Sequence, residues 1–488
     1  MINQMKNIVY LFSVSTLLLT MPACSGFLDE NPYGSVTPET FYKTEQDAVM
    51  AGVSCYKQMN DPTNFWAPGL DAVGDMQSDD IFPFLGWTAK MPTYQFDENY
   101  ETIKGVWNAA YKGISRCNTC IDNVQPMEID EKIKNEVLGQ AYFIRAYWYF
   151  RLVRLYGGVP LIVKEYTSLD NLYVPRSSVD DVYKLIVEDL SFAKENLPDS
   201  WPAPDAGRIT KGASLAYLAS VFLTQEKWAE AESYADQVMT LENQGVYELL
   251  SDFSQIHLET NENNKESILE RQYSTEFSTN WRPVYFGPRS VNLARHAGYG
   301  WMQCSESIVN EFEEKDKRFA ATFFQDGDKL TIGMKEIIYS GEMASGYGPT
   351  EHDIKKGNVF YGETRQIGIN TIVMRYAEVI LYRAEALNEL GRTGEAVPLL
   401  KRIRDRAGLE TKLSYTQDEM RRAIRHERRV EFAFEDIRGW DIIRWGIQDE
   451  VMSHIQGSQW QKGKTELWPL PIFVLDENPN INENNPGW

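Results

Sequence analysis

The stretch LAYLASVFLTQEKWAEAESYADQVM, residues 215–239, predicts two helices joined by a short turn at Thr224–Lys227. Apolar residues recur at spacings of three and four on both sides of that turn, as on the buried face of a helix. Small residues also recur along both halves: Ala216, Ala219, Ala231 and Ala235. Small side chains let two helices approach closely and bury one seam. This combination is the tetratricopeptide pattern.

A second stretch, residues 378–403, repeats the arrangement with Ala384, Ala386 and Ala396 around a turn at Gly391–Gly394. The two turns match in length and in position between their helices. Two unrelated helical hairpins are the alternative interpretation. The matching turns favour tetratricopeptide-like pairs.

The remaining periodicity predicts a mostly α fold, an α/α superhelix of tetratricopeptide-like helix pairs packed against a loop-rich region. Helices are expected at residues 38–59, 106–124, 133–156, 179–196, 213–225, 228–241, 305–314, 374–390, 395–406 and 417–435. Glycine and proline interrupt residues 61–99 and 242–370, so both stretches should be loop-rich, with short strands around 335–340. The tail, residues 467–488, should be extended.

The composition suits a large globular core and excludes some partners. The chain has 488 residues, of which 43% are hydrophobic and 12% aromatic. Its formal net charge of -21 disfavours nucleic acid, because phosphates require a basic face. Neither a cofactor motif nor a phosphate-binding loop is present, so no cofactor is expected.

The N-terminus predicts export and a lipid anchor. Lys6 precedes an apolar stretch at 8–21, and Pro22-Ala23-Cys24 follows, which is the layout of a cleaved signal. We expect residues 1–23 to be removed, Cys24 to carry acyl chains, and residues 24–488 to form a single domain. Several acyl chains together anchor a protein stably to a bilayer. A plain secretory signal with an incidental cysteine is the alternative, and Met21 stands where lipoprotein signals usually have leucine.

An ordered set of motifs resembles one known family. It comprises CSGFLDENP (24–32), FIRAYWYFRLVRLYGGVPLIV (143–163), VPRSSVDDVYKLIVEDL (174–190), GRITKGASLAYLASVFL (207–223), RYAEVILYRAEALNELG (375–391), HERRVEFAFEDIRGWDIIRWG (426–446) and the closing NPNINENNPGW. Together these resemble SusD/RagB-type nutrient-uptake lipoproteins over essentially the whole mature chain. The resemblance implies an outer-membrane lipoprotein that faces the exterior. There it would hold a glycan and deliver it to a TonB-dependent transporter of the SusC type, without catalysis.

Two of these motifs are interpreted as scaffold. Aromatic, Leu and Val residues cover nearly all faces of the helix that ends at Tyr156, so this helix should be buried. The last long motif is charged and should form an ion-pair network: Arg428, Arg429, Glu431, Glu435, Asp436, Arg438, Asp441 and Arg444. Charges can be buried only when they are paired and hydrogen-bonded.

The candidate ligand site lies in the irregular segments, where ring faces can reach solvent. Sugar recognition needs flat aromatic faces and a few fixed polar groups. The first segment offers Trp66, Asp79, Asp80, Phe84 and Trp87, and the second offers Trp281, Tyr285, Arg289, Asn292, Tyr299 and Trp301. None of them lies inside a family motif, so no family binding residue is carried over by position. Core packing beneath a loop is an equal alternative for each tryptophan.

Other interpretations stay open. Asp79-Asp80 could serve a surface glycoside hydrolase, which needs two carboxyls about 5 to 10 Å apart, or could bind calcium. A non-sugar nutrient such as peptide is a further possibility, since the family includes members linked to oligopeptides. Cys117 and Cys120 have the spacing of a redox pair but lie on an expected helix, so a free or locally oxidised thiol pair is favoured. No metal site is expected.

Overall fold

The computed structural model describes residues 41–60, 69–82, 88–165, 173–287, 298–332, 335–341, 349–350, 352–357 and 367–488. The chain divides into two units, Met1–Lys43 and Thr44–Trp488. In the described part of the first unit, the rings of Phe41 and Tyr42 meet edge to face at 4.9 Å. The predicted signal and Cys24 lie outside the described residues.

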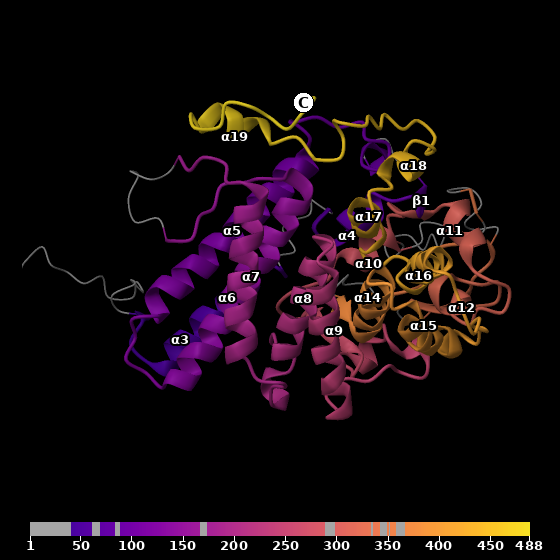
Figure 1. The fold of residues 1–488 in the computed structure, drawn as a ribbon, viewed down its shortest axis with the longest axis horizontal. Helices are drawn as coiled ribbons and strands as arrows, with labels where there is room; N and C mark the ends of the chain where they lie inside the picture. Colours follow the sequence, from indigo (N-terminus) through magenta and orange to yellow (C-terminus); the bar gives the residue numbers. More distant parts are fainter. Residues whose placement is uncertain are drawn as a thin grey trace, which may run out of the picture. The chain divides into compact units, whose positions relative to one another are not determined.

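Nine helices of the second unit form its main layer (Figure 1). They are α3 (Glu45–Tyr56), α5 (Glu101–Val124), α6 (Glu131–Tyr156), α7 (Val179–Asn196), α8 (Lys211–Thr224), α9 (Trp228–Asn243), α14 (Tyr376–Glu389), α15 (Thr393–Ala407) and α16 (Gln417–Glu431). Successive helices pack on one another from α5 to α9, and α9 packs on α14. The predicted fold class, a mostly α superhelix, is confirmed.

Hydroxyl and carboxylate caps explain where several of these helices begin. Asp130 accepts the backbone N–H groups of Lys132 and Ile133 at the start of α6. Thr416 and Glu419 form a reciprocal capping box at the start of α16. Such caps satisfy backbone donors that have no partner inside the helix.

Both tetratricopeptide-like pairs are present as packed hairpins, α8 with α9 and α14 with α15. The alanines that identified the first pair are fully buried. Gly391 has a φ of +76°, which the second turn requires and which glycine adopts without strain. The local pattern therefore located both hairpins.

The structure differs from the expectations for three individual segments. The helix expected to reach 435 ends at Glu431, since Phe434 and Asp436 beyond it have positive φ. The stretch 61–99 is loop-rich as expected, but it also contains an unexpected short helix, the kinked α4 (Gly69–Met76), which packs on α17 (Arg438–Arg444). The tail, expected to be extended, contains α19 (Ile472–Glu477). Tertiary contacts outweigh weak local signals in such short elements.

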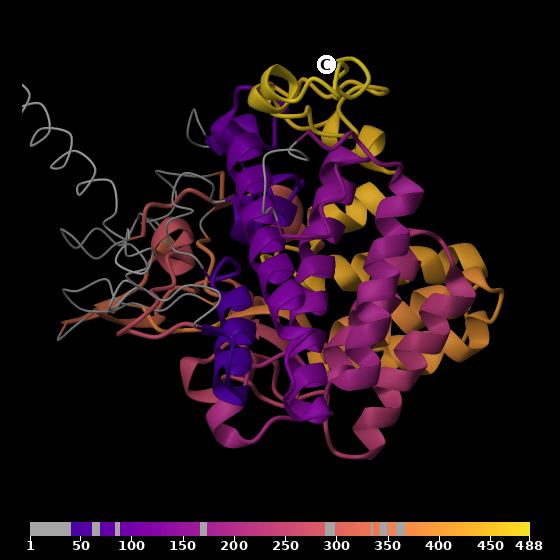
Figure 2. The same cartoon turned by 90° about the vertical axis from the view of Figure 1, so that its left-hand side faces the viewer.

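The short strands pair in twos, all antiparallel. The pairs are β1 (Ile81–Phe82) with β3 (Gln303–Cys304), β2 (Ser267–Arg271) with β6 (Thr371–Arg375), and β4 (Lys329–Ile332) with β5 (Lys335–Ile338). The strand expected around 335–340 is confirmed. In Figure 2, salmon and orange segments of the chain, strands among them, lie on one side of the purple and magenta helices.

Shorter helices complete the described part: α10 (Arg282–Phe286), α11 (Glu306–Glu311), α12 (Phe319–Thr322), α18 (Gln448–Met452), and the single turns η2 (Thr88–Lys90), η3 (Ala203–Asp205), η4 (Phe253–Gln255) and η5 (Glu259–Asn261). None of the helices in the described ranges is long and apolar enough to cross a membrane.

Helix α6 is the centre of the core, as expected from its motif. Its aromatic residues from Phe143 to Tyr156 are almost fully buried, among them Trp148 at 1% exposure. Helix α5 lies very close to α6 at Gly113. A Cβ atom built there would lie 2.1 Å from Nε1 of Trp148. Gly113 is therefore required by packing.

We expect Gly113→Ala to lower the free energy of unfolding by about 1–3 kcal/mol, because the added methyl group overpacks the contact with Trp148. Urea denaturation followed by circular dichroism measures this change. Gly394→Ala in α15 is the matched control, since open space surrounds its Cβ position and its φ is unstrained. That variant should gain up to about 1 kcal/mol from helix propensity. Equal losses in the two variants would contradict the packing argument.

Candidate ligand-binding site

The second irregular segment folds back on itself around α10. The backbone N–H of Tyr299 donates to the carbonyl of Val284 at 2.7 Å, and that of Trp301 donates to the carbonyl of Tyr285 at 2.9 Å. The two arms are so close at Gly298 that a Cβ there would lie 2.0 Å from the carbonyl oxygen of Gly287. These contacts bring together aromatic residues that lie up to 20 positions apart.

Trp281, Tyr285, Tyr299 and Trp301 form one stacked group, which we name the aromatic cluster. The rings of Tyr285 and Trp301 are nearly parallel, with centroids 4.5 Å apart and an interplanar angle of 6°. Tyr299 stacks on Trp301 at 5.3 Å, and Trp281 stacks on Tyr285 at 6.0 Å. Tyr285 is buried at the centre, and the other three rings are partly exposed. Offset parallel stacking is a favoured geometry for aromatic rings.

A small group of buried apolar residues, which we name the apolar base, supports the aromatic cluster. Trp281 and Tyr299 pack against Val284, Ile367 and Ile369. Asn280 links the segment that contains Trp281 to the segment that contains Ile367 and Ile369. Its side-chain amide donates to the carbonyl of Ile369 at 2.8 Å. The rings are therefore held in place by the protein before any ligand arrives.

The cluster is also attached to the helical layer through Arg282. Its guanidinium donates to Asp75 at 3.0 Å and to the carbonyl of Phe434 at 2.7 Å. Burial raises the pKa of Asp75 to about 8 even though Arg282 opposes that shift. Burial, and then the neighbouring Tyr299, raise the pKa of the Tyr285 phenol, so this ring stays neutral.

The first irregular segment meets the second but not through ring stacking. Strand β1 pairs with β3, and the hydroxyl of Ser305 donates to the carbonyl of Asp79 at 2.6 Å. Asp79 is paired with Arg438 at 2.8 Å and with Arg429 at 2.9 Å, and Asp80 is paired with Arg429 at 2.9 Å. The two acids thus join the irregular segment to the last charged motif.

Asp79 and Asp80 therefore have a structural role, because both pair with arginines of the last charged motif. Burial alone would raise the pKa of Asp79, but Arg438 and Arg429 outweigh it and hold the pKa below its usual value. Burial raises the pKa of Asp80 despite Arg429. Asp80 is fully buried, and its environment differs from that expected of a sugar-contacting acid.

Of the residues singled out from the sequence, the structure brings Trp281, Tyr285, Tyr299 and Trp301 together. Trp66, Phe84, Trp87, Arg289 and Asn292 lie outside the described residues.

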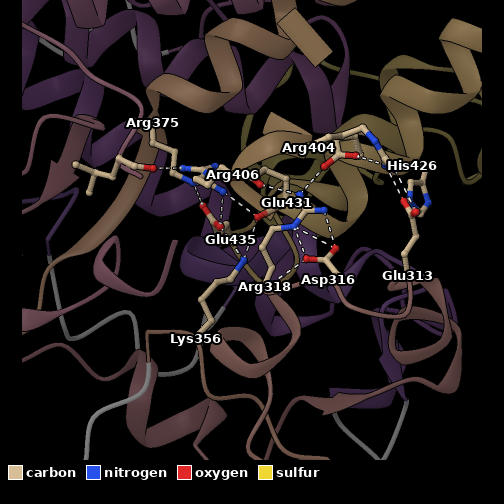
Figure 3. Close-up of polar contacts among 12 residues, drawn as sticks. Glu313, Asp316, Arg318, Lys356, Arg375, Arg404, Arg406, His426, Glu431 and Glu435 are labelled. Atoms are coloured by element: carbon tan, nitrogen blue, oxygen red, sulfur yellow. Dashed lines mark hydrogen bonds and ion pairs between the residues drawn. The ribbon is translucent and has the colours of Figure 1, made fainter. Parts of the chain in front are cut away.

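The predicted ion-pair network is confirmed and is larger than the motif that suggested it. Arg428 forms two hydrogen bonds to Asp441, at 2.7 and 3.0 Å, and Arg444 pairs with Glu385 at 2.6 Å. Glu431 lies between three arginines from elsewhere in the chain, Arg318, Arg375 and Arg406 (Figure 3). These four side chains are at most 3% exposed.

Acid should weaken this network. Burial would raise the pKa of Glu431, but Arg406, Arg375 and Arg318 outweigh it and hold the pKa well below its usual value. Arg375 and Lys356 do the same for Glu435. A carboxyl with a lowered native pKa stabilises the fold above its unfolded pKa, about 4.3, and loses that contribution as pH falls through the native pKa.

We therefore expect the free energy of unfolding to fall as pH decreases from about 5 to 2, measured by urea midpoints at several pH values. A variant with Arg375 replaced by methionine should show a shallower decrease, because Glu435 has lost its main cation. This comparison cancels the contribution of the other carboxyls. Parallel curves for the two proteins would contradict the prediction.

Sequence reasoning missed one member of a thiol group. Cys55 of α3 lies with Cys117 and Cys120 of α5, and all three are free and buried. Hydrogen bonds from the other two thiols lower the pKa of Cys55. The three-residue spacing on α5 was visible in the sequence, but the third thiol comes from another helix. In the described ranges, no group of three or more His, Cys, Asp or Glu side chains is arranged to hold a metal ion.

The fold and the site define a class of protein, a helical-repeat scaffold that holds an aromatic cluster on irregular connections. Two family models match the chain. One, described as the SusD family, matches residues 265–488, and the other, described as starch-binding and associating with the outer membrane, matches residues 26–223.

Known SusD-like proteins match this chain over nearly its full length. The chain is 30% identical to a SusD-like protein P2 of Formosa agariphila, with 98% of this chain and 99% of that protein covered. The chain belongs to the SusD family. A SusD-like crystal structure from Bacteroides fragilis shares the fold, with a TM-score of 0.79 at 23% identity over 92% of this chain and 98% of that one. A laminarin-binding SusD-like protein matches with a TM-score of 0.77 at 25% identity over 92% and 100% of the two chains.

Proposed function

We propose that this protein is a surface-exposed outer-membrane lipoprotein that binds an oligo- or polysaccharide and delivers it to a TonB-dependent SusC-like transporter. It acts by binding and not by catalysis. The observation that supports this proposal most strongly is the aromatic cluster, in which three partly exposed rings stack around Tyr285. Flat ring faces suit the C–H surfaces of sugar rings, and the firm apolar base lowers the ordering cost of binding.

The relatives support this proposal. The laminarin-binding structure shares the fold, and the N-terminal family model is described as starch-binding. Membership of the SusD family supports the predicted lipid anchor at Cys24 and the exterior location, with the helical layer as a rigid face for the transporter. The engagement of Asp79 and Asp80 with arginines favours binding over hydrolysis by that acid pair.

The test is calorimetric titration of the soluble form, beginning just after Cys24, with laminarin, starch and an oligopeptide digest. We expect saturable binding of a glycan and no binding of peptides. Chromatography of the glycan after overnight incubation should show no shorter products. Saturable peptide binding without glycan binding, or release of shorter sugars, would overturn the proposal.

A further inference from the structure

A separate cavity lies inside the helical layer and is rich in arginine. Its volume is about 100 Å³, enough for several water molecules at roughly 10–15 Å³ each or for one compact anion. Helices α6, α8, α16 and α17 contribute to its wall, together with strand β6. We name it the arginine cavity. None of the four residues of the aromatic cluster lines it.

Arg154 of α6 is the residue that makes this cavity unusual. Its guanidinium lies over the rings of Phe150 and Trp440, at 3.9 and 3.8 Å from their centroids. Its Nε donates to the carbonyl of Phe150 at 3.0 Å. Within the described part of the chain it forms no ion pair with any carboxylate, whereas Arg145 on the same helix forms two hydrogen bonds to Asp189.

A second cation lining the cavity also has unused donors. Arg428 is 1% exposed, and its Nε and Nη2 atoms are bound to Asp441. Its Nη1 atom has no hydrogen-bond partner among the described residues. A buried donor without a partner is uncommon in folded proteins and calls for an explanation.

The surroundings add positive charge and a hydroxyl. Arg151 lies one helical turn before Arg154, on the same face of α6, and its Nη1 atom is 3.5 Å from the carboxylate of Asp436. Tyr217, on α8, also lines the cavity. Seven arginine and lysine side chains line the cavity against four carboxylates, and two of the seven, Arg282 and Arg444, pair with the further carboxylates of Asp75 and Glu385.

Deprotonation does not remove the positive charge of Arg154. Burial, and then the neighbouring Arg151, lower the pKa of Arg154 to about 10. Arg154 is therefore still a cation at neutral pH. The carboxylate of Asp441 is shared by Arg428 and Arg444, so it is not available to Arg154.

We propose that the arginine cavity is a binding site for a compact oxyanion of the sulfate or phosphate type. Planar guanidinium groups donate paired hydrogen bonds to such anions, and the low dielectric of a protein interior strengthens these bonds. The anion neutralises Arg154 and accepts a hydrogen bond from Nη1 of Arg428, which has no partner among the described residues. The same chemistry fits inorganic sulfate and the acidic group of a sugar.

Equilibrium dialysis of the intact protein with radiolabelled sulfate tests the proposal, with total ionic strength held constant by sodium chloride. We expect one saturable site per chain with a dissociation constant below 10 mM. Arg154→Met should abolish this binding. Arg154→Lys, which keeps the charge but loses the planar fork, should weaken it at least tenfold. Arg392→Met is the control, because Arg392 is 42% exposed and paired with Glu395.

Two further measurements keep the test decisive. Anomalous scattering from crystals soaked in selenate should place the ion inside the cavity without any variant. Competition by glucose 6-sulfate assigns a sulfated sugar as the source of the oxyanion, and its failure to compete assigns a free inorganic ion. Absence of saturable sulfate binding, or full binding by Arg154→Met, would overturn the proposal and leave the cavity filled by water alone.

Discussion

Replacement of Arg375 by methionine is expected to lower the free energy of unfolding by about 3–5 kcal/mol, the range for breaking a buried ion pair from one side. Arg375 is 1% exposed and pairs with Glu266 at 2.8 Å, Glu431 at 2.6 Å and Glu435 at 2.7 Å (Figure 3). Methionine fills similar space but leaves these carboxylates buried with fewer cations. The loss therefore comes from uncompensated charge more than from a cavity.

Urea denaturation at pH 7 measures the effect. Arg392→Met again provides the control, since an exposed pair such as Arg392 with Glu395 contributes no more than about 1 kcal/mol. If Arg375→Met and Arg392→Met unfold at the same urea concentration, the network does not stabilise the fold as described.

The second large effect concerns binding. Trp301→Ala should reduce affinity for the glycan identified by calorimetry at least tenfold, which corresponds to about 1.4 kcal/mol. Trp301 stacks on Tyr285 at 4.5 Å with an interplanar angle of 6° and is partly exposed, so its removal deletes a ring face and loosens Tyr299. Aromatic anchors of this kind commonly dominate binding energy. Titration calorimetry of both proteins provides the comparison.

Trp228→Ala is the matched control for this experiment. Trp228 is a partly buried tryptophan at the start of α9, in the helical layer, and its removal should leave affinity within twofold of the original. Trp301→Phe should retain part of the affinity, because a smaller ring face remains. Unchanged affinity in Trp301→Ala together with a lower unfolding temperature would identify the ring as core and the site as misassigned.

Helix pairs and the aromatic cluster were predictable because their members are close in sequence. The alanines of α8 and α9 recur at helical spacing, and the four rings lie within one irregular segment. The roles of Asp79 and Asp80 were not predictable. Their partners Arg429 and Arg438 are about 350 positions away, so nothing in the local pattern separates a sugar-binding acid from a buried partner.

By itself, the sequence determined the mostly helical class, the two hairpins, the buried helix α6 and the charged character of the last motif. Helical periodicity, caps and turns act between residues a few positions apart, so they can be read along the chain. Only the tertiary structure decided which acids meet Arg375 and Arg429, how the rings stack around Tyr285, and that Arg154 pairs with no carboxylate in the described ranges. Burial and pairing depend on where distant segments meet, and side-chain identity alone does not specify that.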